Sequence, residues 1–465
     1  MDRCHQARVR NALEPEWEAR FEPRSYGFRP GRSCQDAIGA IYTTCKGPRA
    51  KRVWALDADL AAAFDRIDHA HLLATIGAFP AREMIHDWLK AGVFESGKGF
   101  APTEEGTPQG GVISPLLLNV ALHGLEEAAG VSYATSGSGA SETKPGSPAL
   151  IRYADDMVVL CHTRERAEHI KARLTEWLTP RGLSFNEDKT PIVHLAENGF
   201  DFLGFNVRRY RSKLLIKPSN AAIRRLRQRL ASEMRTLRGS NAAAVIATLN
   251  PIIKGWAAYH RGVVSSKVFH SLDYQMWKLT YKWATWHHNN KPKPWIVDHY
   301  FGKHNKFRND RWVFGDPESN AYLVKFSWTD IVRHVMVTGA ASPDDPALTD
   351  YWAKRRRKVK PPLDSYTLRL LARQDARCPL CGDHLLAADQ PPQSPHEWER
   401  WWLQVTRKAI AADYLVHQGR PGPPGNDQTR LVHTSCQRGL RARLTQGTST
   451  VNLHAPAACL SRMPR

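Results

Sequence analysis

The sequence predicts a mixed α/β domain, followed by a helical domain and a small metal-binding module. Residues 1–205 alternate segments of helical and strand-like periodicity, which is typical of an α/β fold. Residues 206–335 are rich in tryptophan, lysine and arginine, which predicts helices with basic outer faces and aromatic inner faces. Residues 373–443 contain two closely spaced Cys/His pairs, which predict a metal site.

The charge balance indicates the class of partner. The 465 residues include 66 Lys and Arg against 45 Asp and Glu, a net charge of +21. Such a surplus favours a polyanionic partner, because cations placed on phosphates release counterions; a merely basic surface is the alternative. No apolar run reaches the roughly 18 residues of a membrane span, and the first residues, MDRCHQARVRNALEPEWE, lack the apolar stretch expected of a signal peptide. The scattered cysteines predict a reducing compartment, so we expect a cytoplasmic protein.

Alternating apolar and turn-forming segments predict the elements of the first domain in order. They are helices Arg3–Glu18 and Cys34–Cys45, strands Val53–Leu56, Ala149–Tyr153 and Met157–Cys161, helix Arg164–Thr179 and strand Ile192–His194. The segment Tyr153–Asp156 lies between the apolar runs LIR and MVVL, which predicts a β-hairpin with two acids at its turn.

Three acids in this domain point to metal chemistry. Asp155 and Asp156 are adjacent, and adjacent carboxylates repel unless a cation neutralises them. Asp59 ends an apolar strand, and neighbouring strands of one sheet would bring it to the hairpin. Three such carboxylates can hold two Mg²⁺ ions about 3.5–4 Å apart, one to activate a 3′-hydroxyl and one to neutralise a triphosphate. A solvated Asp-Asp turn is the alternative.

Six blocks, in order, resemble the reverse transcriptases of group II introns. The blocks are SYGFRPGRSCQDAI (Ser25–Ile38), ALDADLAAAFDRIDH (Ala55–His69), EGTPQGGVISPLLLNV (Glu105–Val120), RYADD (Arg152–Asp156), GLSFNEDKT (Gly182–Thr190) and FDFLGF (Phe200–Phe205). The resemblance implies a right-hand polymerase palm with partial fingers over residues 1–205. It also implies RNA-directed DNA synthesis from dNTPs on a DNA primer, intron mobility and a bacterial source.

The resemblance assigns roles to individual residues. These are Mg²⁺ ligation by Asp59, Asp155 and Asp156 with the Leu60 carbonyl, exclusion of a ribose 2′-hydroxyl by Phe64, contact with the template–nucleotide pair by Gln109, and proximity to the triphosphate for Lys189. From the residues alone, Phe64 could also be a core aromatic and Lys189 a solvated lysine. We expect no catalytic role for Asp57.

Relatives in this family carry a further N-terminal stretch, with fingers strands and basic residues that grip the triphosphate. Met1 falls within the helix that follows that stretch, so we expect an N-terminally truncated polymerase. The alternative function is a polymerase-inactive maturase that acts only by binding intron RNA.

The helical region resembles the thumb/maturase domain (domain X) of the same family over residues 206–335. Such a domain grips intron RNA and assists splicing without chemistry of its own. The candidate phosphate contacts are Arg224, Arg225, Arg229, Lys254, Arg261 and Lys267. Its aromatic residues can pack in the core or stack on unpaired bases.

The C-terminal region combines a linker, a metal module and a tail. Residues 336–372 predict a linker or DNA-binding segment, and residues 444–465 a disordered tail. The predicted ligands of one structural Zn²⁺ are Cys378, Cys381, His433 and Cys436. The module at 373–443 resembles an HNH endonuclease domain, with His417 as candidate general base on a DNA target. Gln437 stands where the family has a histidine, which favours DNA binding over cleavage, with HNH-type endonuclease activity as the alternative.

Overall fold

The computed structural model describes residues 2–95, 99–101, 103–107, 110–134, 143–305, 308–358, 360–386, 391–403, 410–414 and 429–445. The chain divides into two compact units. The first comprises Met1–Arg238, His260–Trp283 and Asp330–Trp352, and the second comprises Gly239–Tyr259, Ala284–Thr329 and Ala353–Arg465. Within the described residues, no helix combines the length and apolarity needed to cross a bilayer.

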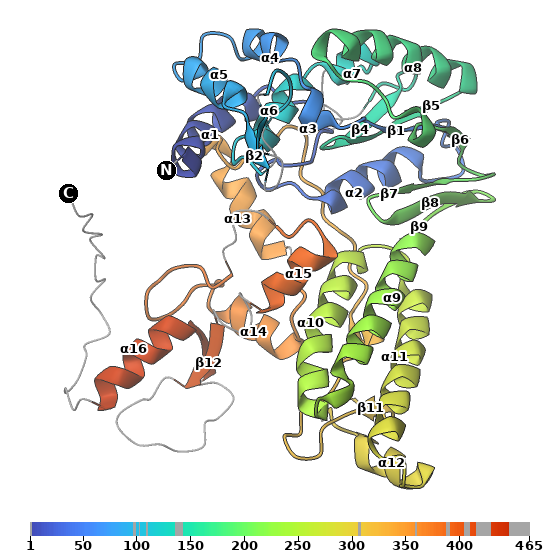
Figure 1. Cartoon of the computed structure of the whole chain (residues 1–465), viewed down its shortest axis with the longest axis vertical. Helices are drawn as coiled ribbons and strands as arrows, with labels where there is room; N and C mark the ends of the chain where they lie inside the picture. The colour runs from blue at the N-terminus through green and yellow to red at the C-terminus, as the bar shows by residue number, and fades with distance from the viewer. Residues whose placement is uncertain are drawn as a thin grey trace. The chain divides into compact units, whose positions relative to one another are not determined.

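A four-stranded antiparallel sheet in the order β4-β5-β1-β6 forms the centre of the first unit. Its strands are β1 (Trp54–Asp59), β4 (Ala149–Tyr153), β5 (Asp156–Cys161) and β6 (Ile192–His194). Helix α8 (Arg164–Leu178) packs on β1 and β5, and α2 (Cys34–Cys45) packs on β4 (Figure 1). Helices cover the sheet, so β4 and β5 are apolar along most of their length. The predicted α/β fold and hairpin are confirmed.

Further helices complete the core of this unit. They are α1 (Asp2–Glu18), α3 (Ala63–Arg66), α4 (His69–Ile76), α5 (Arg82–Lys90), α6 (Ser114–Ala121) and α7 (Leu125–Ala128), with the hairpin strands β2 (Val93–Glu95) and β3 (Gly99–Ala101). Helix α1 buries Leu13 and Trp17 in the main core. Asp68 caps α4, because its carboxylate accepts a hydrogen bond from the His71 backbone N–H at 2.6 Å.

A second antiparallel sheet leads from the first sheet into the long helices. Its strands are β7 (Phe200–Phe202), β8 (Phe205–Tyr210) and β9 (Lys213–Pro218), followed by helices α9 (Asn220–Thr236), α10 (Ala242–His260), α11 (Ser266–His287) and α12 (Lys293–Tyr300). The hydroxyl of Ser219 caps α9 by accepting from the Ala222 N–H at 3.1 Å. Leu226 and Leu230 of α9 are buried, which confirms the amphipathic pattern of this helix.

The second unit contains the C-terminal elements, apart from residues 349–352, which belong to the first unit. After the short strands β10 (Phe301–Gly302) and β11 (Val313–Phe314) come helices α13 (Thr349–Lys358), α14 (Ser365–Arg373) and α15 (Pro395–Trp401), strands β12 (Ile410–Tyr414) and β13 (Thr429–His433), and helix α16 (Thr434–Thr445). Helix α15 packs on α10 at Gly255, where a Cβ would lie 2.6 Å from Cγ of Glu399. A separate small core joins α14 to β13 through Leu370, Leu371 and Val432.

Residues 330–352 return to the first unit and bind α2. The buried carboxylate of Asp36 accepts from the Val337 N–H at 2.8 Å, and His334 Nε2 lies 2.9 Å from the same oxygen. Arg32 Nη2 donates to the Gly339 carbonyl at 2.8 Å. The segment expected as a linker at 336–372 is thus divided between the two units. From residue 446 onward, the expected tail lies outside the described residues.

Candidate active site and metal centre

The three predicted acids meet at one end of the four-stranded sheet. Strands β1 and β5 pair so that Asp59 lies directly opposite Asp156. On the other side of β5, Tyr153 pairs with Asp156, which leaves Ala154 and Asp155 as the two-residue turn. Ala154 has a φ of 57°, in the left-handed region that tight hairpin turns use. Sheet pairing therefore places acids that are distant in the sequence on neighbouring strand ends.

Burial and neighbouring charges raise the pKa values of Asp155 and Asp156. Burial, followed by the charges of Asp155 and Asp59, raises the pKa of Asp156 to about 6. Burial also raises the pKa of Asp155, and the charge of Asp59 adds to the effect. One nearby cation opposes this, because Lys189 Nζ lies 3.3 Å from Asp59 Oδ2 and lowers the pKa of Asp156. A divalent cation would relieve the same repulsion.

The donor set suits hard divalent cations such as Mg²⁺, which prefer carboxylate and carbonyl oxygens. Carboxylates on neighbouring strand ends can share two such ions held about 3.5–4 Å apart. Leu60 follows Asp59 directly and is buried, and it bridges to Phe185.

A buried network beneath the hairpin turn was not predicted. Arg152, 1% exposed, donates from Nη1 to the Ala154 carbonyl at 3.2 Å and to Asn119 Oδ1 at 2.8 Å. Asn119 Nδ2 in turn donates to the Gly27 carbonyl at 2.9 Å. Burial lowers the pKa of Arg152 to about 10, with the charge of Glu22 opposing the shift. The residues Arg152, Asn119 and Gly27 lie within the sequence blocks quoted above, but only the tertiary fold brings them together.

Asp57, for which we expect no catalytic role, is a further acid beside this site. It precedes Asp59 by two positions in β1, so both side chains point to the same face of the sheet. Burial, and then the charges of Asp156 and Asp201, raise the pKa of Asp57 to about 7. Because side chains alternate between the two faces of a strand, the sequence of β1 could have predicted that Asp57 lies on the same face as Asp59.

The other predicted polymerase residues differ in their surroundings. Phe64 is half-buried against the main core, and its carbonyl accepts from the Thr107 N–H at 2.6 Å. Its ring meets the ring of Phe28 edge-to-face, with centroids 6.1 Å apart. The Lys189 side chain, in the 3₁₀ helix η3 (Glu187–Lys189), is 68% exposed and can therefore reorient. Gln109 lies outside the described residues.

The six candidate phosphate contacts separate into two groups. Outward-facing positions on α9 and α11 are Arg224, Arg225 and Lys267, which are exposed, and Arg229, which lies 3.9 Å from Glu233. Lys254 is instead half-buried, with its Nζ 4.5 Å from the ring centroid of Trp402. Burial lowers the pKa of Arg261, and the charge of Asp330 opposes that shift. Lys254 and Arg261 are thus less exposed than Arg224, Arg225 and Lys267.

Helix α11 presents a line of aromatic rings beside its lysines. Tyr274 stacks on Trp277 with an interplanar angle of 11°, and Trp277 stacks on Tyr281 at 18°. The Tyr274 ring is 59% exposed, and Lys278 Nζ lies 4.4 Å from its centroid. Such exposed rings next to cations are typical of surfaces that stack on bases.

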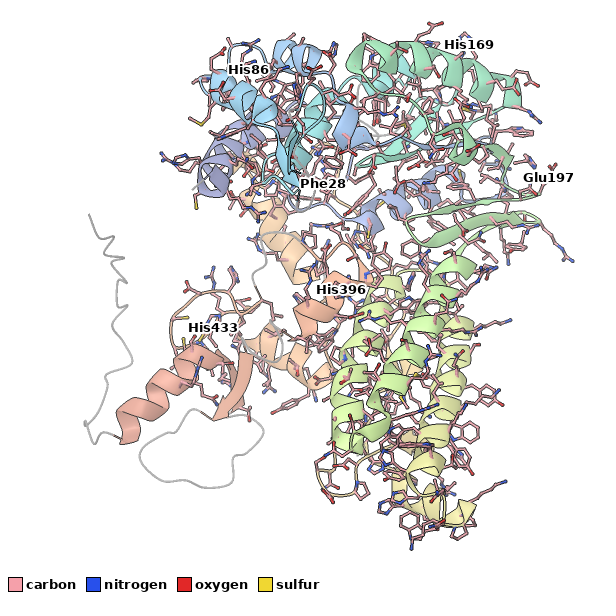
Figure 2. The ribbon with its side chains drawn as sticks, viewed as in Figure 1. Phe28, His86, His169, Glu197, His396 and His433 are labelled. Atoms are coloured by element: carbon pink, nitrogen blue, oxygen red, sulfur yellow. The ribbon has the colours of Figure 1, made fainter. Side chains whose placement is uncertain are left out.

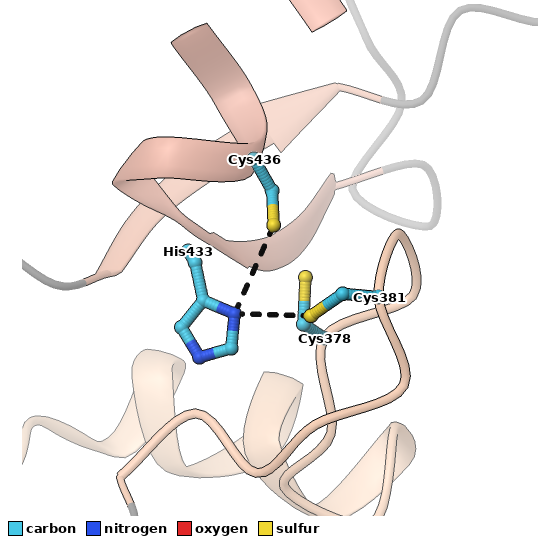
Figure 3. Close-up of side chains that lie close together, drawn as sticks. All are labelled: Cys378, Cys381, His433 and Cys436. Atoms are coloured by element: carbon cyan, nitrogen blue, oxygen red, sulfur yellow. Dashed lines mark hydrogen bonds between the residues drawn. The ribbon is translucent and has the colours of Figure 1, made fainter. Parts of the chain in front are cut away.

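The four predicted zinc ligands come together at the C-terminus. The ligand atoms of Cys378, Cys381, His433 and Cys436 lie within 4.8 Å of one another (Figure 3). His433 Nδ1 is 3.3 Å from the Cys381 sulfur and 4.0 Å from the Cys436 sulfur. His433 Nε2 lies 3.2 Å from the His384 carbonyl, so a proton held there leaves Nδ1 free to ligate.

The cysteine knuckle and its electrostatics also suit a thiolate-binding cation. The Gly382 N–H bonds back to the Cys378 carbonyl at 2.8 Å, and Gly382 has a φ of 81°, which closes the knuckle. Burial opposes the Cys378 thiolate, but backbone donors from His433, Leu380 and Cys381 outweigh it and lower the pKa of Cys378 to about 7. The described cysteines form no disulfide. His417, the candidate general base, lies outside the described residues.

Comparison with known proteins agrees with the order of these parts. The chain matches the family Reverse transcriptase (RNA-dependent DNA polymerase) over residues 1–207 and the family Group II intron, maturase-specific domain over residues 223–301. The fold and the matched regions define a reverse transcriptase domain followed by a maturase domain. In the order of these two regions the chain is similar to group II intron reverse transcriptase/maturases.

Two curated relatives illustrate the likeness. Protein YkfC of Escherichia coli is 34% identical over 240 residues, which cover 46% of this chain and 62% of YkfC. The group II intron-encoded protein LtrA of Lactococcus lactis is 39% identical over 130 residues, 27% of this chain and 21% of LtrA. This chain thus spans less than two thirds of either. A telomerase structure from Candida tropicalis aligns with 48% of this chain and 41% of its own at 14% identity and a TM-score of 0.33, too weak a likeness to argue from.

Proposed function

We propose that the chain is an RNA-directed DNA polymerase that also acts as a maturase, binding group II intron RNA to assist splicing and mobility. The observation that supports polymerisation best is the cross-strand pairing of Asp59 with Asp156, next to Asp155 in the turn. Bound Mg²⁺ would supply Lewis acidity for in-line attack of a primer 3′-hydroxyl on a dNTP. Asp59, Asp155 and Asp156 would hold the two ions, with the Leu60 carbonyl assisting.

The neighbouring side chains would select and hold the nucleotide. Phe64, five residues after Asp59, would fill the space that a ribose 2′-hydroxyl needs. Lys189 would exchange its ion pair with Asp59 for the triphosphate, since its exposed ammonium can reorient. Gln109 would contact the template–nucleotide pair.

Primer extension on an RNA template tests the metal assignment. Asp156→Asn and Asp155→Asn should each lower the extension rate by about 100-fold or more, because isosteric amides cannot neutralise the ions. Asp201→Asn, a nearby but exposed acid, should extend normally. Wild-type extension by Asp156→Asn would end the assignment. A wild-type protein that binds intron RNA without extending a primer would instead support the RNA-binding maturase alternative.

For the maturase role, the exposed cations of α9 and α11 would contact phosphates, and the α11 rings would stack on unpaired bases. The outward positions of Arg224, Arg225 and Lys267 support this role, and so does the exposed Tyr274 ring. Intron RNA, a DNA target and a primer are the partners that we propose. The described cysteines form no disulfide, and we propose a reducing compartment such as the bacterial cytoplasm.

For the C-terminal module we propose one structural Zn²⁺ and a DNA-binding role. Three cysteines and one histidine would complete a tetrahedral shell, and a closed shell of four protein ligands is typical of structural rather than catalytic zinc. The antiparallel β12–β13 pair followed by α16 also agrees with an HNH-like module. Plasmid nicking by the full chain, abolished by His417→Ala, would establish the nuclease alternative; no nicking would leave DNA binding alone.

A further inference from the structure

Four of the polymerase-like blocks meet around Gly27 and Phe28. The Gly27 carbonyl accepts from Asn119 of α6, and a Cβ on Gly27 would lie 2.2 Å from the Ala154 backbone nitrogen. The Phe28 ring contacts Phe64, which follows β1. The segment that carries Phe28 is thus held by α6, by the acid hairpin and by the residues after Asp59.

Phe28 has an unfavourable backbone conformation that its neighbours impose. Its φ is 60°, in the left-handed region that a bulky side chain rarely adopts. On one side Gly27 is fixed against the hairpin. On the other side Arg29 makes two hydrogen bonds of 2.8 Å to the buried carboxylate of Glu18. Strain of this kind persists only where the surroundings over-determine it, and it is common at functional sites.

The strained backbone presents the Phe28 ring to Phe64. The two rings meet edge-to-face with an interplanar angle of 71° and centroids 6.1 Å apart, which is a favourable aromatic geometry. Phe28 remains 38% exposed and is labelled on the first unit in Figure 2. Phe64 is therefore supported by the core on one part of its surface and by the Phe28 ring on another.

We propose that Phe28 is a positioning residue for sugar discrimination, acting by holding the Phe64 ring in place. The proposal rests on the polymerase function proposed above. A side chain excludes a 2′-hydroxyl only if it keeps its position when a ribonucleotide binds. Contact with the Phe28 ring prevents the Phe64 ring from moving away, so the preference for dNTPs over rNTPs depends on Phe28 as well as on Phe64.

The test compares kcat/KM for dCTP and CTP during extension of a DNA primer on an RNA template. Phe28→Gly and Phe28→Ala should both lower the dCTP/CTP ratio by about twofold to tenfold, the range expected for loss of one aromatic pair. The loss should come mainly from better use of CTP. Phe28→Tyr should keep the ratio, because it keeps the ring. Glycine adopts a φ of 60° without strain and alanine does not, so equal ratios in these two variants assign the effect to the ring rather than to the backbone.

A double-mutant cycle separates action through Phe64 from direct contact with substrate. In a Phe64→Ala background, Phe28→Gly should change the dCTP/CTP ratio no further. Additive effects, or an equal loss for both nucleotides with an unchanged ratio, would overturn the proposal and leave the polymerase function standing. A wild-type protein that incorporates no dCTP would overturn both.

Discussion

Gly27 and Ala154 are in such close backbone contact that no side chain fits between them: a Cβ on Gly27 would lie 2.2 Å from the Ala154 nitrogen. We therefore expect Gly27→Ala to displace the hairpin turn that carries Asp155. Displacement of about 1 Å can lower a rate by roughly 100-fold, and overpacking lowers stability by about 1–3 kcal/mol. Primer extension and urea unfolding measure the two effects.

Gly146→Ala is the matched control for this substitution, because a Cβ on Gly146 meets nothing within 4 Å. It should leave both extension and unfolding unchanged. Normal extension by Gly27→Ala would mean that the turn tolerates displacement, and the close approach would then have no catalytic importance.

Lys189→Ala should raise KM for dNTPs by about tenfold, the range expected when a charge-assisted hydrogen bond to the triphosphate is lost. Stability should change by less than about 0.5 kcal/mol, since exposed ion pairs contribute little. Lys171 provides the control, because its Nζ lies 2.6 Å from Glu187, which belongs to the same η3 helix as Lys189. If Lys171→Ala raises KM equally, the effect reflects local charge rather than a nucleotide contact.

The Cys/His group predicts one zinc ion per chain. His433→Ala should weaken zinc binding by at least about 100-fold, more than loss of an outer-shell partner does. Competition with a chromophoric chelator measures the affinity, and elemental analysis measures the content. Cys4→Ser removes an exposed cysteine outside the group and should retain the metal. Unchanged zinc content in His433→Ala would exclude this site.

Salt dependence distinguishes the outward cations from the inward ones. In a plot of log affinity for intron RNA against log salt concentration, replacing Arg224 and Arg225 by alanine should reduce the magnitude of the slope by about 2. This is roughly one unit for each lost phosphate contact. Lys254→Ala should leave the slope unchanged, because Lys254 packs over Trp402. An unchanged slope in the double variant would remove α9 from the RNA interface.

Buried His260 should make the first unit sensitive to acid. Burial lowers the pKa of His260 to about 3, and its ring packs edge-to-face against Phe205. Below pH 6.5 the unfolded chain therefore binds a proton that the native state does not. The free energy of unfolding should fall as the pH drops, by up to about 1.4 kcal/mol per pH unit between roughly pH 6 and pH 4.

Denaturant unfolding across this pH window measures that slope. His260→Phe should reduce it, whereas His86→Gln, at an exposed position, should not (Figure 2). Equal slopes for the wild type and His260→Phe would mean that other groups determine the acid sensitivity.

Local patterns predicted the elements and the acid trio because their signals lie within short segments. The strand Ala149–Tyr153 and the helix Cys34–Cys45 have the predicted ends. β1 extends to Asp59 rather than ending at Leu56, because pairing with β5 continues to its last residue. Asp59 and the hairpin could be predicted to meet because both lie at the ends of strands, and strands of one sheet pair side by side.

Contacts between distant segments account for what the sequence did not reveal. The sequence shows Arg152 as part of a block but not as the support of the Ala154 turn, because its partner Asn119 comes from the distant helix α6. Lys254 and Arg261 carry charge in the sequence, yet burial decides whether that charge meets solvent. The charge of a side chain is known from the sequence, whereas its exposure to solvent is known only from the structure.

The docking of residues 330–352 on α2 has a consequence for biosynthesis. Asp36 and His334 are 298 residues apart, and the helical domain lies between them in the sequence. At about 5–20 residues per second, the ribosome needs on the order of 15–60 s to deliver the second partner after the first. Until then Asp36 Oδ1 lacks the contacts from His334 and Val337 in the growing chain, although Ser33 already donates to the other oxygen. The first unit therefore completes its folding only after residues 239–259 and 284–329 of the second have been synthesised.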